Sequence, residues 1–259
     1  IIASACVYIQ RMKQLIYLII YMCLLPIATM AQQRRVENRP YTDLRPFHFG
    51  VVVGVHMQDV ELFNAGPQTL TLDGGQVVET NIAAEQDRYD PGFVVGVTGE
   101  LRLNRHFQLR AVPAMYFGNR HLVFKNQGQT DVDGQPIVHR QDMKTVYIST
   151  AFNLIFAAPR FNNHRPYLVA GINPMLNLSG SDTDILRFKR HDVFAEVGIG
   201  CDFYLPYFKL RPELKFMFSL IDCLDAKHVD RLRDKNLVSY ARSTSRATSK
   251  MIALSFYFE

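Results

Sequence analysis

Charged side chains recur at alternate positions along several segments that are otherwise rich in Val, Leu, Ile and Phe. Alternate residues of an extended chain share one face, where carboxylates and cations can pair with one another or line a path for ions or protons. In a narrow, poorly solvated interior a nearly balanced set neutralises itself, so we favour a structural network and keep a narrow ion or proton path as the alternative. The residues of this set are Glu100, Arg102, Arg110, Glu196, Asp202, Lys209, Arg211, Glu213 and Lys215.

The sequence offers no constellation typical of metal binding or catalysis. Its eight histidines are scattered, none lies at a metal-ligand spacing from a cysteine, and no His-Glu-x-x-His motif occurs. Ser149, Ser179 and Ser219 have no histidine at a common depth that could act as their base. We therefore predict no metal, no cofactor and no enzymatic activity.

The elements that carry the charges are strands. From Phe47 to Gln58 the residues alternate between apolar and mainly polar or small side chains, and period-two alternation over about ten residues is typical of a membrane β-barrel strand. Seven more segments repeat the pattern. The predicted fold is therefore all-β, an eight-stranded antiparallel up-and-down transmembrane β-barrel of the outer-membrane type. The eight segments are 47–58, 93–103, 107–117, 145–156, 165–178, 190–203, 208–218 and 249–258.

The connections between these segments support the same topology because they alternate in length. Membrane barrels have short periplasmic turns and longer external loops. The short connections all fall on the side where the chain enters and leaves the barrel, as an even number of strands requires. The long connections are 60–90, 118–142, 179–187 and 222–246, and the short ones are 104–106, 157–164 and 206–207.

The tightest turns also fix which residues face each other. The two-residue turn places Asp202 opposite Arg211, and the three-residue turn places Glu100 opposite Arg110. A register wrong by one residue would send these charges into lipid, at a cost of up to about 2–4 kcal/mol for an arginine at the membrane midplane.

A few residues fit the strands poorly. Pro113, Pro174 and Pro212 lie inside predicted strands and cannot donate a backbone hydrogen bond, so we expect local bulges there. Lys250 falls on the lipid face and would have to extend towards the membrane surface.

The beginning of the chain predicts export. Arg11 and Lys13 precede a short apolar run, and Thr29-Met30-Ala31 ends it with small residues at the −3 and −1 positions, as in a secretory signal peptide. We expect residues 1–31 to be an upstream extension plus a cleaved signal peptide, with Met12 the natural start. Residues 32–45 then form a periplasmic segment, and 46–259 form a barrel in the cell outer membrane. Cys201 and Cys223 remain after cleavage, as free thiols near opposite ends of the barrel.

The charge distribution points to the cell surface rather than to nucleic acid. The net charge is +5, with no clustered basic face, so we predict no nucleic-acid partner. The first long loop is acidic with Arg88 opposing, and the last is basic. Solvation or pairing with lipopolysaccharide phosphates explains such loops most simply, and a specific protein partner is the alternative. The loop charges are Glu61, Asp73, Glu79, Glu85, Asp87 and Asp90, then Lys227, Arg231, Arg233, Lys235, Arg242 and Arg246.

Four stretches resemble the PorT family of outer-membrane proteins. They are Phe47-His48-Phe49-Gly50-Val51-Val52-Val53-Gly54, Tyr89-Asp90-Pro91-Gly92-Phe93, Gly198-Ile199-Gly200-Cys201-Asp202-Phe203-Tyr204 and Leu210-Arg211-Pro212-Glu213-Leu214-Lys215-Phe216. The resemblance implies a component of the type IX secretion system of Bacteroidota, which are Gram-negative bacteria. That system exports proteins with C-terminal sorting domains, including gingipain-type proteases and adhesins. The family has no agreed catalytic residues.

A barrel of eight strands is too narrow to pass a folded protein. The resemblance therefore implies an accessory role as a membrane anchor or assembly factor, with outer-membrane lipid, lipopolysaccharide and other components of the machinery as partners. Three alternatives remain: a general structural or adhesive barrel, a narrow channel, and a soluble ligand-binding barrel with its apolar side chains inward.

Overall fold

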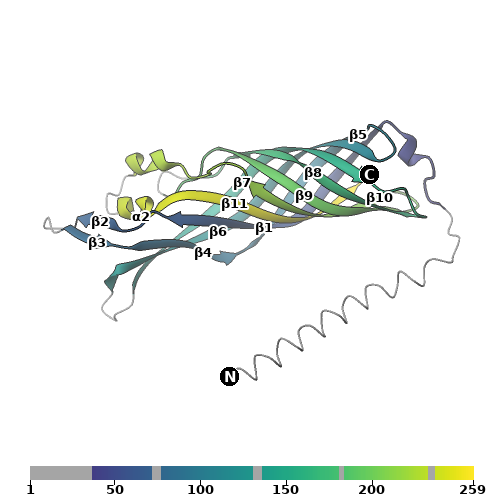
Figure 1. The fold of residues 1–259 in the computed structure, drawn as a ribbon. Coiled ribbons are helices and arrows are strands. Elements are labelled where there is room, and N and C mark those ends of the chain that lie inside the picture. The colour runs from purple at the N-terminus through teal and green to yellow at the C-terminus, as the bar shows by residue number, and fades with distance from the viewer. Residues whose placement is uncertain (1–36, 72–76, 131–135, 181–183, 233–236) are drawn as a thin grey trace, which may run out of the picture. The chain divides into compact units, whose positions relative to one another are not determined.

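The computed structural model describes residues 37–71, 77–130, 136–180, 184–232 and 237–259. Residues Asn38–Glu259 form one compact unit, and the predicted signal peptide and residues 32–36 lie outside the described residues. In this unit eight antiparallel strands form a closed ring, in the order β6-β5-β1-β11-β10-β9-β8-β7 and back to β6 (Figure 1). The predicted fold class is confirmed.

The strands are long, and several extend beyond the predicted segments. The ring consists of β1 (Phe47–Asn64), β5 (Pro91–Arg102), β6 (Phe107–Thr130), β7 (Pro136–Ala157), β8 (His164–Asn177), β9 (His191–Tyr204), β10 (Lys209–Ser219) and β11 (Thr244–Phe258). The other elements are β2 (Gln68–Thr71), β3 (Val77–Thr80), β4 (Ile82–Tyr89), the 3-10 helices η1 (Thr42–Leu44) and η2 (Ala226–Arg231), and the helix α2 (Val238–Arg242).

The alternation sorts the side chains between the two faces of the wall. On β1, Phe49, Val51 and Val53 point outward and are exposed, whereas Val52 and His56 point inward and are buried. The same outward apolar face runs around the ring. Among the described residues, no helix is long and apolar enough to cross a membrane. The apolar face is therefore a lipid-facing band, and the stripe does not point into a ligand cavity.

The predicted register is confirmed. Glu100 faces Arg110 in the β5–β6 hairpin. In the β9–β10 hairpin Leu210 faces Phe203 and Glu213 faces Gly200, which puts Arg211 opposite Asp202.

The prediction of bulges at the three prolines is wrong. Pro113 pairs with Thr150, Pro174 with Val193, and Pro212 with Phe256, and the described pairing keeps one register on both sides of each proline. Each residue of an antiparallel strand sends its N–H to one neighbouring strand only, so a proline removes one bond of the ladder and need not shift it.

Residues 60–90 and 118–142 are not simply loops, as the sequence had suggested. Beyond the membrane band β6 and β7 continue as one hairpin. There β4 pairs with the outer half of β6, because β5 begins only at Pro91 and does not extend into this part. β2 and β3 form a further hairpin (Figure 1). In this outer part the alternation reverses, because Leu122 and Phe124 point inward while His121 and Lys125 point outward. A strand surrounded by water buries the opposite set of residues from one surrounded by lipid.

Candidate functional site: the closed lumen and its periplasmic mouth

A network of ion pairs crosses the middle of the barrel. Arg110 on β6 is fully buried and donates from Nε to Glu100 on β5 (3.0 Å) and from Nη1 to Glu213 on β10 (2.7 Å). Its guanidinium also lies 4.6 Å from the ring centre of Tyr257 on β11. One side chain thus joins strands on opposite parts of the ring.

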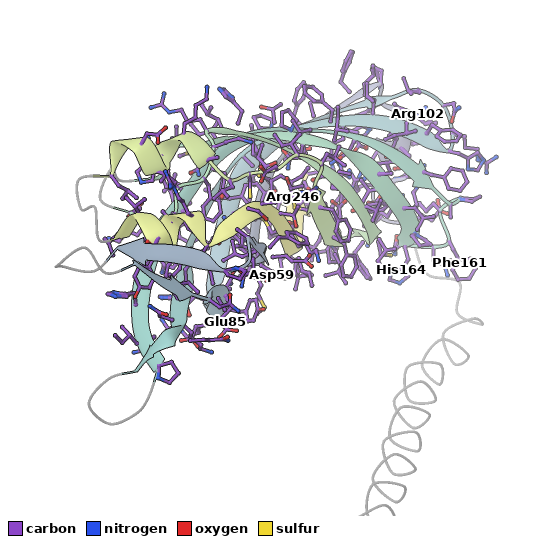
Figure 2. The ribbon with its side chains drawn as sticks, turned by 60° about the vertical axis from the view of Figure 1, so that its left-hand side comes forward. Asp59, Glu85, Arg102, Phe161, His164 and Arg246 are labelled. Atoms are coloured by element: carbon purple, nitrogen blue, oxygen red, sulfur yellow. The ribbon has the colours of Figure 1, made fainter. Side chains whose placement is uncertain are left out.

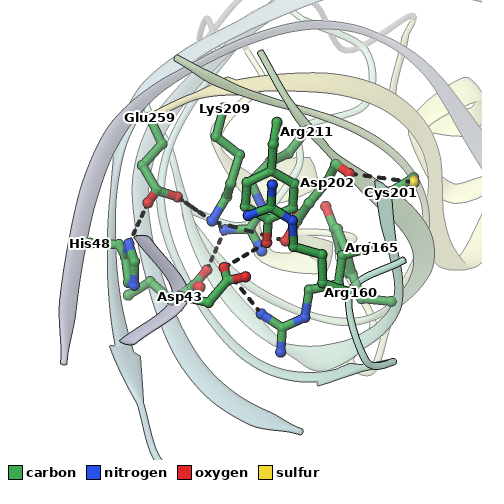
Figure 3. Close-up of polar contacts among 12 residues, drawn as sticks. Asp43, His48, Arg160, Arg165, Cys201, Asp202, Lys209, Arg211 and Glu259 are labelled. Carbon is green, nitrogen blue, oxygen red and sulfur yellow. Dashed lines mark hydrogen bonds and ion pairs between the residues drawn. The ribbon is translucent and has the colours of Figure 1, made fainter. Parts of the chain in front are cut away.

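The network continues towards the end of the barrel that carries the short turns. Arg211 donates to Asp202 (2.6 Å) and to Glu100 (2.6 Å), and Lys209 pairs with Glu259 (2.7 Å). Glu259 also binds the ring of His48 (Figure 3). Towards the external end, Lys215 lies 3.6 Å from Glu196 and 3.7 Å from Glu213 and donates to the Tyr257 hydroxyl.

Eight of the nine predicted lumen charges are therefore buried and brought together by ion pairs. Arg102 is the exception. It lies half-buried at the end of β5 and donates to the carbonyls of Leu44 (3.3 Å) and Asn104 (3.4 Å), without an ion pair among the described residues. The alternation predicts correctly that Arg102 faces inward. Its position at the end of β5, however, places the guanidinium at the mouth, where it is half-buried and bound by backbone carbonyls.

Other members of the network were missed. His48 lies on an inward-facing position of β1, and Glu259 directly follows β11 in step with its inward-facing residues, so the same alternation could have found them. Arg120 is fully buried nearer the external end and donates to Gln58 (3.0 Å) and Ser249 (2.7 Å). It was missed because it follows Phe117, where the outward apolar pattern stops.

A second, apolar core closes the external end. Leu122 and Phe124 of β6 pack with Leu186, Phe188 and Leu224, which come from the third and fourth external connections. Gln141 fixes this packing because its side chain accepts from the Leu186 N–H (3.0 Å) and donates to the Leu186 carbonyl (2.9 Å). The external end is thus capped by the chain itself.

The periplasmic mouth is partly covered by the segment that precedes β1. Asn38 binds the side chain of Asn163 and the Tyr204 carbonyl, and the hydroxyl of Tyr204 donates to Asp43 (2.5 Å). Arg160 donates to the carbonyls of Asn38 and Arg39. These contacts tie the segment to the turn that joins β7 and β8 and to the end of β9.

Outside the membrane band two acidic residues of the first connection have lysine partners on neighbouring strands, which the sequence did not predict. Glu61 pairs with Lys250 (2.6 Å), and Glu85 binds Lys125. Figure 2 labels Glu85 in this outer part, towards the opposite end of the barrel from Arg102. Lys250 is therefore ion-paired at the outer edge of the lipid face. The side chains of Asp73, Glu79, Arg231, Arg233 and Lys235 lie outside the described part of the structure.

His121 bridges three strands in this outer part. Its Nε2 lies 2.8 Å from Asp90, which follows β4, and its Nδ1 lies 2.6 Å from Asp142 on β7. Hydrogen bonding to Asp142, and then to Asp90, raises the pKa of His121, and the bond with His121 lowers the pKa of Asp90.

The remaining reactive side chains are isolated. Cys201 is half-exposed on the outer wall and Cys223 is buried in the external core, and both are free thiols. Burial raises the pKa of Cys223 to about 12, which keeps it protonated. In the described part of the chain no group of three or more His, Cys, Asp or Glu residues could hold a metal ion.

Comparison with known proteins agrees with this architecture. Residues 30–225 match the family described as outer membrane protein beta-barrel domain. No curated protein sequence matches the chain. Similar solved structures include Neisserial surface protein A, with 12% identity and a TM-score of 0.40 over 82% of this chain and 98% of that one. OprG of Pseudomonas aeruginosa has 10% identity and a TM-score of 0.39 over 81% of this chain and 91% of that one.

Another similar structure is Ail of Yersinia pestis in complex with the heparin analogue sucrose octasulfate. It has 14% identity and a TM-score of 0.35 over 83% of this chain and 100% of that one. These likenesses concern the fold alone. The family match covers most of the chain, and the closed ring of eight strands with its lipid-facing band fits it. The chain belongs to the outer membrane protein beta-barrel domain family and resides in the outer membrane.

Proposed function

We propose that this barrel is a non-conducting, non-enzymatic membrane anchor that works by binding partner proteins outside its lumen. The observation that carries the proposal is the ion-pair network around Arg110, which fills the width of the lumen. A conducting pore needs sites that an ion can both enter and leave. Here the carboxylates are already neutralised by fixed guanidinium and ammonium groups.

The capped external end supports the same proposal. Water or ions entering from outside would first have to displace the apolar core around Leu122 and Phe124, and then the pairs below it. Two barriers of opposite chemistry in series are unsuited to conduction. They suit a rigid support that presents its rims to other molecules.

The finer proposal is that the partners belong to a type IX protein-export machinery, with the chain as an accessory anchor or assembly factor of PorT type. The resemblance in the sequence supports it, and the resembling stretches lie at the start of β1, at the β4–β5 junction and in the β9–β10 hairpin. The alternative is a general structural or adhesive barrel. A sealed lumen is equally compatible with that role.

Outer-leaflet lipid is part of the proposed environment. The rings of Phe93 and Phe117 stack on the lipid face (4.7 Å between ring centres), and Lys144 lies beside them at the lining of a shallow pocket. Arg88 and Arg140 line the next pocket outward. Cations placed just above an apolar face suit the phosphates of lipopolysaccharide.

Two experiments test these proposals separately. In planar bilayers the purified barrel is expected to give no channel activity, and a steady conductance would contradict the sealed anchor. Deletion of the gene in its natural host is expected to abolish secretion of proteins with C-terminal sorting domains while the envelope stays intact. A leaky envelope with normal secretion would support the general structural role instead.

A further inference from the structure

The periplasmic mouth contains a pocket rich in arginine. It has a volume of about 320 Å³ and is lined by Asp43, Leu44, Arg102, Arg105, Pro159, Arg160 and Arg165. Four guanidinium groups thus meet one carboxylate. These residues come from the segment before β1, the end of β5, the β5–β6 and β7–β8 turns and the start of β8 (Figures 2 and 3 show Arg102, and Asp43 with Arg160 and Arg165).

Among the residues that the structure describes, three of these four cations lack an acidic partner. Arg165 is the one with a carboxylate, since its Nη1 lies 3.6 Å from Asp43, and that aspartate also accepts from Tyr204. Arg102 and Arg160 bind oxygens of backbone carbonyls and, for Arg160, of the Asn163 amide. The side chain of Arg105 is exposed and has no hydrogen bond or ion pair with any residue that the structure describes.

The cations in the lumen beside the pocket differ from those of the pocket, because they are paired with carboxylates. There Arg110, Arg211, Lys209 and Lys215 each have at least one carboxylate within ion-pair distance. In the middle of the lumen the cations are thus paired with carboxylates, and Arg120, nearer the external end, is bound by Gln58 and Ser249 instead. At the periplasmic mouth, which the apolar cap does not close, several cations have no carboxylate partner among the described residues.

The direction in which the pocket faces identifies the kind of anion. Arg102 and Arg165 occupy inward-facing positions of β5 and β8, so their side chains point towards the barrel axis and away from the lipid. Phosphates of the inner leaflet surround the outside of the wall and are poorly placed to enter. Carboxylates on a chain that approaches along the axis can enter, and guanidinium groups bind carboxylates through paired N–H donors.

We infer that this pocket binds an acidic segment of a periplasmic protein through its side-chain or terminal carboxylates. The inference names the chemistry of a partner and so rests on the proposal that the barrel works by binding partners. The new ion pairs are made by Arg102, which is bound only by backbone carbonyls, and by the exposed Arg105. Arg160 and Arg165 hold the segment and the turns that shape the pocket.

The test is a binding titration with the full barrel folded in a zwitterionic detergent. A fluorescein-labelled hexaglutamate peptide is expected to bind saturably, more weakly as salt rises, while a labelled hexalysine peptide does not bind. The double variant R102Q/R105Q is expected to weaken binding at least tenfold. The matched control K189Q/R190Q removes two exposed cations at the external end and is expected to leave the affinity unchanged.

Several outcomes would overturn the inference. They are the absence of saturable binding, an equal loss in the external control, and displacement of the peptide by lipid nanodiscs containing phosphatidylglycerol but not by neutral ones, which would make the pocket a lipid site. Inorganic phosphate that competes as well as the peptide would reduce it to a general anion site. Secretion after gene deletion is measured independently, so a failure here leaves the anchor proposal standing.

Discussion

For the buried ion pairs at the centre of this barrel, removing one partner lowers the free energy of unfolding by more than an intact pair adds to it. Forming a pair in a poorly solvated interior barely repays the cost of desolvating two charges, whereas removing one partner leaves an uncompensated charge. Arg110 is the extreme case, because it is fully buried and serves both Glu100 and Glu213.

The substitution Arg110→Met is therefore expected to lower the free energy of unfolding by about 3–5 kcal/mol. Urea titration of the protein in lipid vesicles measures it. Arg105→Met, at an exposed turn, is the matched control and is expected to change the free energy by less than about 0.5 kcal/mol. Equal changes in the two variants would show that the buried ion pairs of Arg110 do not contribute more to stability than an exposed arginine does.

His121 gives the outer strands a dependence on pH. Its folded-state pKa is raised above the ordinary 6.5, so its contribution to stability is fully present below that value and is lost as pH rises through the folded-state pKa. The pKa of Asp90 is lowered from 3.8, so its contribution is present above that value and lost as pH falls through the lowered pKa. The bridge between the strands is strongest between these limits.

Replacing Asp142 by Asn is expected to lower the pKa of His121, because the hydrogen bond to Asp142 is the largest cause of the upward shift. An NMR titration of the imidazole proton resonances measures the change. The control is Asp87→Asn on the neighbouring strand β4, because the Asp87 carboxylate makes no hydrogen bond to the His121 ring among the residues that the structure describes. A pKa that stays fixed in Asp142→Asn would contradict the bridge.

Within the elements, the close approach of β5 and β6 requires a glycine at position 96 but not at position 99 of β5. A Cβ atom on Gly96 of β5 would lie 2.4 Å from the Pro113 carbonyl oxygen and 2.7 Å from Cα of Ala114, both on β6. A Cβ atom on Gly99 would meet nothing closer than 3.7 Å, at the ring of Phe49.

Gly96→Ala is thus expected to destabilise the barrel by about 1–3 kcal/mol, since the backbone of β6 has to move. Gly99→Ala is expected to change stability by less than about 0.5 kcal/mol. Parallel urea titrations compare the two variants, and the prediction fails where Gly99→Ala is the more damaging.

The elements also show how far sequence reasoning reaches. Alternation and turn length suffice to predict eight strands and pairs such as Glu100 with Arg110, because period two leaves one register that keeps charges out of lipid. They do not predict the outer halves of β6 and β7. There Leu122 and Phe124 point inward and His121 points outward, so a search for an outward apolar stripe ends at Phe117 although the strand continues.

In the candidate site the same reasoning predicts which face of the wall a side chain occupies better than how far along the barrel axis it lies. Arg102 and Arg211 both face inward, but one reaches water at the mouth and the other lies among carboxylates. Depth depends on where the neighbouring strands and the segment before β1 end. That information is spread over the chain and is not contained in a single strand.

For the whole molecule, the arrangement of short turns at one end predicts its orientation in the membrane. With Cys201 and Cys223 replaced by Ala, Asp142→Cys is expected to react with a membrane-impermeant maleimide on intact cells, since the Asp142 side chain is 77% exposed in the outer part. Arg105→Cys, at a short turn, is expected to react only after the outer membrane is permeabilised. Labelling in the reverse order would invert the topology.

The pairing of β1 with β11 means that the ring is completed by its first and last strands. Until β11 is in place, β1 and β10 each present a row of unpaired N–H and C=O groups, which invites pairing with other chains in water and is costly in hydrocarbon. Contacts so distant along the chain also form slowly. A newly exported copy therefore spends its most vulnerable period as an open sheet, dependent on periplasmic chaperones, and a copy truncated before β11 is destined for aggregation or proteolysis rather than insertion.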